Sequence, residues 1–593
     1  MGLNLNWKSG LTVMAEGVSK QAISPPGGDL LRNNGQLVFL VTLNVLLLFL
    51  LACCYPVDYL RANFNKILVF AFSPQFLFFG CSGALLLYKK LSEKMYSTAL
   101  FTTCFAYFYI FHRHQQHVLS LRGDNLCQIA YWEILFHPNL TGSIGASFTK
   151  PGQLVIMGLL YELNVLLGDY AFSAGMCLVM AFCVWSLARI ASDIGGRIAG
   201  IIVFPVSCAV FMAEFMHGSY SIFLIPVLFS GIRYYFYNPE RKSLGRFLLL
   251  FSIQFHIQAV ALLGTIWGIL IVKKEWKELF KFSGLGVLSL ALWVAVILRV
   301  QGTLDRLNCG AAVGYIASYN DFDGDFAPGD KLGYFMCVAR EGFEANYYYI
   351  IPLAVLAALG IAGCFRYGFK QYLTTFSAII LLLFNVLVLG GDFNFERYFA
   401  LFYAFAVSVG IGMIVRFVLG VKRERRLLSI VLSAVAVLAL VMIFDFSLFR
   451  RFANVQPQMF PFVVSASKIL EDNKIPESAR LMTEDDLLYP LVVLQPDRYP
   501  KLTALQYFNV APEPERKRIL AKTDYIWISI NARHMYYYLD YLPEPAWLSD
   551  PFRLMVTYII QEQKPRYLYG YWFVPVDLDY ERLILKVESV KYL

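Results

Sequence analysis

Residues that can do chemistry gather in the polar loops between the apolar segments of this 593-residue chain. Asp124 follows the third such segment. Further ionisable and hydroxyl groups follow two later segments: Glu214, His217, Asp392, Glu396, Arg397 and Tyr398. A carboxylate can accept a proton, and an arginine can hold an anion. Because ionisable groups close to a bilayer usually mark a site, the pattern predicts a binding or catalytic site at one membrane face.

The composition places these loops in a membrane protein. Hydrophobic residues make up 58% of the chain and charged residues 16%, and the mean hydropathy is +0.55. An ordinary soluble domain needs no such apolar content. The net charge of +9 could suggest nucleic acid, but most basic residues sit in short clusters beside apolar runs. The positive-inside rule explains these clusters better, so no nucleic-acid partner is expected.

Apolar runs of about 17 to 25 residues, long enough to span a bilayer, recur along the chain. They lie at 36–56, 67–88, 95–112, 170–190, 197–212, 219–237, 282–300, 347–364, 372–389, 399–420 and 427–446. Two more are ambiguous, because 152–167 is short and 247–272 is long with Gln254, His256 and Gln258 in its middle. The predicted fold class is a polytopic α-helical membrane protein with about 11–14 apolar segments.

Six clusters of basic residues give these segments an orientation. They lie at 89–94, 189–197, 241–246, 273–281, 366–370 and 422–426. All six can be cytoplasmic only if 152–167 does not fully cross and 247–272 crosses twice, as two short helices. The amino terminus is then inside and the tail outside. His256 and Gln258 then lie near the outer face, where two half-helices meet, and such breaks usually line a cavity.

Three regions follow from this interpretation. We expect a cytoplasmic lead at 1–34, a multi-span transmembrane domain that carries the site at 35–446, and a small extracytoplasmic α/β domain at 447–593. In the tail, 465–473 has the pattern of a helix, whereas 525–530, 567–576 and 582–590 have the pattern of strands. Cys309 and Cys337 share one loop placed outside, where a disulfide and two unrelated thiols are both open.

Two short motifs carry a family resemblance. The first predicted external loop contains Leu-Arg-Gly-Asp-Asn-Leu-Cys-Gln-Ile-Ala-Tyr at 121–131, and Lys150-Pro151 then opens an apolar segment. An Arg397-Tyr398 pair stands where a late segment leaves the outer face. These motifs resemble the GT-C superfamily of membrane glycosyltransferases that use polyprenyl-phosphate sugars, as aminoarabinose transferases and protein mannosyltransferases do. One departure is an extra amino-terminal hairpin, because the loop follows the third segment here.

The resemblance implies roles for the site residues. Asp124 would be the catalytic base of an inverting transfer, in which a hydroxyl of a lipid, glycan or protein acceptor attacks the donor sugar. Arg397 and Lys150 would hold the donor phosphate, with Tyr398 and His256 as hydrogen-bond donors. Further substrate contacts are expected from Arg122, Glu214, His217, Asp392, Glu396 and Gln258. The reaction would take place at the outer face of a bacterial inner membrane.

Simpler interpretations stay open. Asp124 could be a solvated loop carboxylate, Arg397 could extend to the membrane interface beside a glutamate, and His256 could be a satisfied core histidine. Glu214 and His217 could simply form a turn at the membrane interface. Two rival functions also remain: an O-antigen or polysaccharide polymerase or ligase, and a lipid-linked-glycan transporter, which would need paired repeats with broken helices.

No metal site is predicted. His112, His114 and His117 do not share one helix face. The acidic loop at 321–330 superficially resembles a calcium loop, but its glycine comes too early and no glutamate closes it at the required spacing. The motifs require no cofactor and leave a divalent cation open.

Overall fold

A computed structural model gives the fold. It describes residues 74–87, 91–113, 124–136, 150–211, 215, 219–256, 258–301, 336, 340, 350, 353–384, 399–420, 468–483, 491–492, 501–505, 508, 513–529, 566–579 and 582–589. The predicted lead at 1–34, the predicted boundary between 446 and 447, and the cysteines Cys309 and Cys337 lie outside these residues. The division into three regions therefore stays a prediction.

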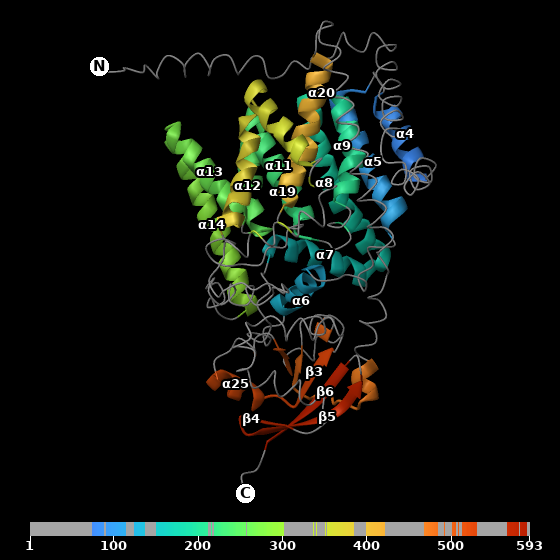
Figure 1. Cartoon of the computed structure of the whole chain (residues 1–593), viewed down its shortest axis with the longest axis vertical. Coiled ribbons are helices and arrows are strands. Elements are labelled where there is room, and N and C mark those ends of the chain that lie inside the picture. Colours follow the sequence, from blue (N-terminus) through green and yellow to red (C-terminus); the bar gives the residue numbers. More distant parts are fainter. Residues whose placement is uncertain are drawn as a thin grey trace, which may run out of the picture.

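Helices form the upper, larger part of the molecule (Figure 1). In chain order they are α4 (Pro74–Leu86), α5 (Glu93–His112), α6 (Asp124–Phe136), α7 (Pro151–Leu167), α8 (Asp169–Gly195), α9 (Arg197–Val210), α11 (Ser221–Tyr237), α12 (Lys242–Phe251), α13 (Gln258–Val272), α14 (Trp276–Gln301), the helix Leu353–Tyr367, α17 (Phe376–Phe384), α19 (Ala400–Phe405) and α20 (Ile411–Gly420). Short 3₁₀ segments η4 (Pro239–Arg241) and η7 (Lys370–Thr375) join some of them, and the π-helical turn η9 (Ala406–Gly410) joins α19 to α20.

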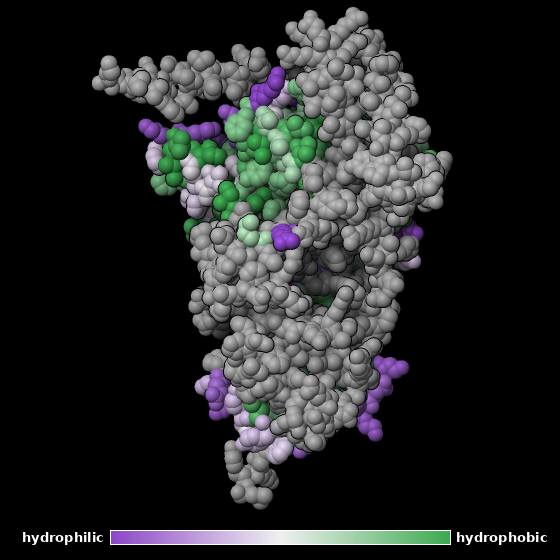
Figure 2. All heavy atoms as spheres, in the orientation of Figure 1, coloured by the Kyte–Doolittle hydropathy of each residue, from purple (hydrophilic) through white to green (hydrophobic). Residues whose placement is uncertain are grey.

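Three helices within the described residues are long and apolar enough to cross a membrane: Tyr170–Gly195, Trp276–Val300 and Ala400–Leu419. Large apolar side chains of α13 and α14 are exposed, among them Val272, Phe280 and Leu288. Figure 2 shows one apolar face of the helical region. Lipid would cover such a surface, which a soluble monomer rarely exposes. The predicted helical, membrane-type fold is confirmed in this form, and the number of crossings stays a prediction.

The predicted break in the long apolar run 247–272 is present. α12 ends at Phe251, the 3₁₀ turn η5 (Ser252–Gln254) follows, and α13 begins at Gln258 and contacts α12. The side-chain amide of Gln254 donates hydrogen bonds to the carbonyl and hydroxyl oxygens of Ser289 on α14, both at 2.7 Å. This buried contact anchors the turn, because the N–H groups of a buried amide are costly to leave without partners.

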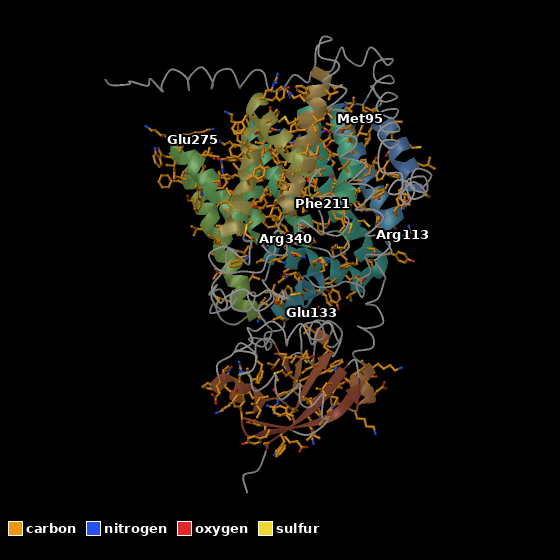
Figure 3. The ribbon with its side chains drawn as sticks, viewed as in Figure 1. Met95, Arg113, Glu133, Phe211, Glu275 and Arg340 are labelled. Carbon is orange, nitrogen blue, oxygen red and sulfur yellow. The ribbon has the colours of Figure 1, made fainter. Side chains whose placement is uncertain are left out.

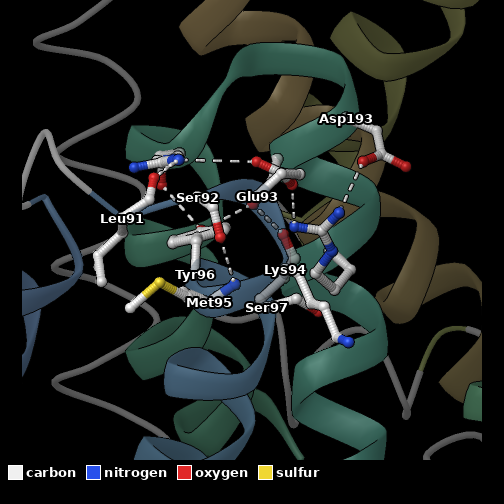
Figure 4. Close-up of polar contacts among 12 residues, drawn as sticks. Leu91, Ser92, Glu93, Lys94, Met95, Tyr96, Ser97 and Asp193 are labelled. Atoms are coloured by element: carbon white, nitrogen blue, oxygen red, sulfur yellow. Dashed lines mark hydrogen bonds and ion pairs between the residues drawn. The ribbon is translucent and has the colours of Figure 1, made fainter.

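A network of ion pairs joins helices α5, α8 and α11 at the end of the helical region that lies away from the sheet (Figures 3 and 4). Arg189 contacts Glu93 at 2.5 Å and Asp193 at 3.4 Å, and Arg233 also pairs with Asp193. Arg197 donates to the carbonyl oxygen of Leu91 at 2.6 Å. Arg189 is only 7% exposed, so these carboxylates are its necessary partners. One of the predicted basic clusters, 189–197, thus holds helix ends together.

Close packing between helices uses residues without side chains. A Cβ added to Gly195 of α8 would lie 2.4 Å from the carbonyl oxygen of Gly412 on α20, and one added to Gly410 would lie 2.4 Å from the carbonyl oxygen of Leu356. Small residues let helix backbones approach in this way in membrane proteins. The helical core therefore depends on these glycines.

A six-stranded mixed sheet lies beyond the other end of the helical region (Figure 1). Its strands are β1 (Leu481–Thr483), β2 (Leu502–Ala504), β3 (Tyr525–Ser529), β4 (Arg566–Leu568), β5 (Tyr571–Asp579) and β6 (Arg582–Ser589), in the order β2-β1-β3-β6-β5-β4. The first three are parallel and the others antiparallel. Helix α25 (Glu513–Leu520) contributes Ile519 and Leu520 to one apolar face of the sheet. A small α/β unit is present, as the sequence predicts.

One predicted strand is a hairpin. The sequence pattern suggests a single strand at 567–576, but β4 ends at Leu568 and β5 begins at Tyr571, with these two residues paired. Tyr569 and Gly570 between them have φ values of 53° and 88°. Two consecutive positive φ values make a two-residue turn whose twist suits a hairpin. The single-strand prediction is wrong because an aromatic residue occupies a turn position that usually takes Asn or Asp.

Candidate functional site

Four of the predicted site residues lie within the described part of the chain. Asp124 is the first residue of α6, Lys150 directly precedes α7, His256 lies between η5 and α13, and Gln258 is the first residue of α13. The remaining predicted residues lie outside it: Arg122, Glu214, His217, Asp392, Glu396, Arg397 and Tyr398. The described part of the candidate site therefore consists of Lys150, His256 and the starts of α6 and α13.

Lys150 and His256 meet on one aromatic ring, that of Tyr220. The ammonium nitrogen of Lys150 lies 4.8 Å from the centroid of the Tyr220 ring. The imidazole of His256 stacks on the same ring at a centroid distance of 4.0 Å and an interplanar angle of 15°. The three residues are 70 and 36 positions apart in the chain, so the fold alone brings them together. That Lys150 and His256 share a functional site stays a prediction.

Two buried hydrogen bonds of amide side chains tie the start of α6 to the start of α7. The amide nitrogen of Gln153 donates to the side-chain oxygen of Asn125 at 3.0 Å, and the backbone N–H of Lys150 donates to the side-chain oxygen of Gln128 at 3.3 Å. All three amide side chains are almost fully buried. Asn125 and Gln128 are three residues apart and so share one face of α6. This clasp places the backbone of Asp124, the neighbour of Asn125, close to the start of α7.

Gly152 lets α7 approach the turn that carries His256. A Cβ added to Gly152 would lie 2.9 Å from a ring carbon of Phe255 and 3.1 Å from the Cβ of Gln254. Pro151 opens the helix, where its missing N–H is not needed. The sequence Lys150-Pro151-Gly152 thus combines a cation, a helix start and a close contact with η5.

Several helix N-termini face the same region, which favours negative charge there. α7 begins beside Lys150, α13 begins two residues after His256, and α6 is tied to α7 by the amide clasp. The free N–H groups and the dipole of a helix N-terminus attract anions. Figure 3 shows Glu133 of α6 near the sheet and Met95 of α5, two residues after Glu93 of the ion-pair network, towards the opposite end of the helical region. The site and the ion-pair network therefore occupy opposite ends.

The described part of the chain contains no cluster of side chains that could bind a metal ion. No three His, Cys, Asp or Glu side chains there are arranged to hold a metal ion. His112 is buried and packs on Tyr107, with ring centroids 5.3 Å apart. His114, His117 and the acidic loop at 321–330 lie outside the described residues.

Sequence comparison finds no matching family model and no matching curated protein. Among solved structures, those similar to this chain include structures of ArnT. Two of these structures are ArnT from Cupriavidus metallidurans, one bound to undecaprenyl phosphate and one in the apo state. They are 11% and 12% identical, with TM-scores of 0.39 and 0.43, and each match covers 83% of this chain and 98% of that chain.

Proposed function

We propose that this chain is a membrane glycosyltransferase that moves a sugar from a polyprenyl-phosphate donor to a lipid, glycan or protein acceptor. One observation carries the proposal: the start of α6 at Asp124, the start of α7 at Lys150 and the helix break at His256 converge at one end of the helical region. A carboxylate, an ammonium group and several helix N-termini are the groups that a sugar phosphate and an attacking hydroxyl require.

The reaction would proceed as one displacement. Asp124 accepts the proton of the acceptor hydroxyl as its oxygen bonds to the anomeric carbon, and the bond from that carbon to the phosphate oxygen breaks with inversion. The polyprenyl phosphate leaves with one more negative charge than it had as a diester. Lys150 and Arg397 would stabilise that charge, and His256 and Tyr398 would donate hydrogen bonds to the phosphate.

The proposal also covers the substrate contacts, the place of the donor lipid and the membrane in which the protein sits. Arg122, Glu214, His217, Asp392, Glu396 and Gln258 would contact the substrates. The lipid chain of the donor would lie between helices within the bilayer, and the carboxyl-terminal sheet would help to select the acceptor. The protein would sit in a bacterial inner membrane with its site at the outer face, which agrees with a basic ion-pair network at the opposite end of the helices.

A transfer assay tests the proposed activity. Detergent-purified protein is incubated with membrane extract and a panel of radiolabelled polyprenyl-phosphate sugars. Label is expected to pass from one of these donors to an extractable acceptor. The proposal is rejected if no donor loses label to any acceptor while the purified protein remains folded.

Cysteine labelling tests the proposed orientation. Cysteines introduced at Ser143, Asn320 and Ser549 should react with an impermeant reagent in intact spheroplasts, because these positions are proposed to lie outside. A cysteine at Ser243 of α12 should react only after lysis, because it lies in a basic cluster at the opposite end. The unsubstituted protein gives the background. If the cysteine at position 243 reacts in intact spheroplasts, the proposed orientation is wrong and the two sides must be exchanged.

A further inference from the structure

We propose that Tyr220 is a positioning residue that holds Lys150 and His256 together as one anion-binding pair. The inference rests on the proposed function, since it assigns a role to a residue beside the proposed phosphate site. Tyr220 directly precedes α11 and belongs to none of the motifs that suggest a glycosyltransferase.

The geometry makes Tyr220 the common neighbour of the pair. Its ring is only 4% exposed, and Lys150 is 8% exposed. The ammonium nitrogen at 4.8 Å and the stacked imidazole at 4.0 Å both lie within contact range of this ring. Lys150 comes from the start of α7 and His256 from the turn before α13. Tyr220 therefore joins two elements that are far apart in the chain.

The backbone of Tyr220 is itself fixed. Its carbonyl oxygen accepts hydrogen bonds from the backbone N–H groups of Phe223 and Leu224, at 3.1 and 2.9 Å. The hydroxyl groups of Ser219 and Ser221, on either side of it, lie 3.1 Å apart within hydrogen-bond distance. The backbone that carries the ring is therefore held by hydrogen bonds to the first turn of α11. A ring whose backbone is fixed can hold the flexible side chain of Lys150 in one position, which a mobile ring could not do.

The physical effect is preorganisation. The face of an aromatic ring is electron-rich and attracts an ammonium group. A free lysine side chain samples many rotamers, and ordering it during binding weakens affinity. Held on the Tyr220 ring, the ammonium group is already in place when a phosphate arrives. As a positioning residue, Tyr220 touches neither the phosphate nor the reacting sugar. Its contribution should therefore appear in the affinity for polyprenyl phosphate.

A titration with polyprenyl phosphate as the probe tests the inference on the full-length protein in detergent. Tyr220→Leu is expected to weaken the affinity about 2- to 30-fold, the range of a cation–π contact from exposed to desolvated sites. Tyr220→Phe keeps the ring and should bind as the wild type does. Tyr235→Leu is the matched control, because Tyr235 is also 4% exposed and lies 5.2 Å from the ammonium nitrogen of Lys242, at the other end of α11. It should leave the affinity unchanged.

Fluorinated phenylalanines at position 220 provide a second test that keeps the shape of the ring. Each added fluorine reduces the negative charge of the ring face, so affinity should fall stepwise with fluorination. A residue that only fills space would show no such trend. In a Lys150→Met background the trend should disappear, because its partner is gone.

Two outcomes separate this inference from the proposed function. If Lys150→Met weakens binding but Tyr220→Leu and all fluorinated variants bind as the wild type does, the positioning role is overturned and the phosphate site stands. If Lys150→Met also binds the probe as the wild type does, the assignment of the phosphate to Lys150 fails, and the role of Tyr220 fails with it.

Discussion

Asp124→Asn is expected to slow sugar transfer by about 10²- to 10⁴-fold, the usual contribution of a general base. Asparagine keeps the size of the side chain and its capacity for hydrogen bonds, but it cannot accept the proton of the acceptor hydroxyl. The loss should therefore appear in the chemical step, measured by single-turnover transfer from preloaded donor, and donor affinity should be unchanged.

A matched substitution on the sheet side controls for this change. Asp472 is an exposed carboxylate outside the proposed site, so Asp472→Asn should leave transfer unchanged. Near-normal turnover by Asp124→Asn would exclude Asp124 as the base. Glu214 would then be the next carboxylate to replace.

Lys150→Met is expected to raise the dissociation constant of polyprenyl phosphate by about 10- to 150-fold. Methionine fills similar space without a charge, and a charge-assisted contact in a partly dry site is worth about 1.5 to 3 kcal/mol, at about 1.4 kcal/mol per tenfold. Lys150→Arg should restore part of the affinity, since it returns the charge with a different shape. A binding titration on purified protein measures each value.

The control for Lys150 is Lys242, which also lies over a tyrosine ring but at the opposite end of the helices. Lys242→Met should not change the affinity for polyprenyl phosphate. If Lys150→Met also leaves it unchanged, the phosphate must be held elsewhere, and Arg397 becomes the first residue to test.

The broken helix could be predicted from the sequence because its cause is local. Three polar residues in the middle of a long apolar run, Gln254, His256 and Gln258, do not suit a lipid-exposed helix, and the basic clusters on both sides require the chain to turn back. What the sequence cannot show is the partner that fixes the turn. Ser289, which accepts from Gln254, is one hydroxyl among many in apolar helices.

The meeting of Lys150, Tyr220 and His256 was predictable only in part. The predicted topology places Lys150 and His256 near one membrane face, but their distance depends on how closely α7 packs against η5. That distance is set by Gly152, whose missing side chain is a tertiary requirement. The sequence predicts no role for Tyr220, because a tyrosine beside an apolar segment is common at membrane interfaces. Its only signal in the sequence is the polar pair His217 and Ser219 just before it.

The clasp between α6 and α7 has a consequence for the response to acidity. It is built from the amides of Asn125, Gln128 and Gln153, and amide side chains do not titrate in the range where proteins are folded. The spacing between the start of α6 and the start of α7 is therefore independent of proton concentration. A pH–rate profile of this protein would therefore contain no contribution from the clasp that sets the spacing between the backbones of Asp124 and Lys150.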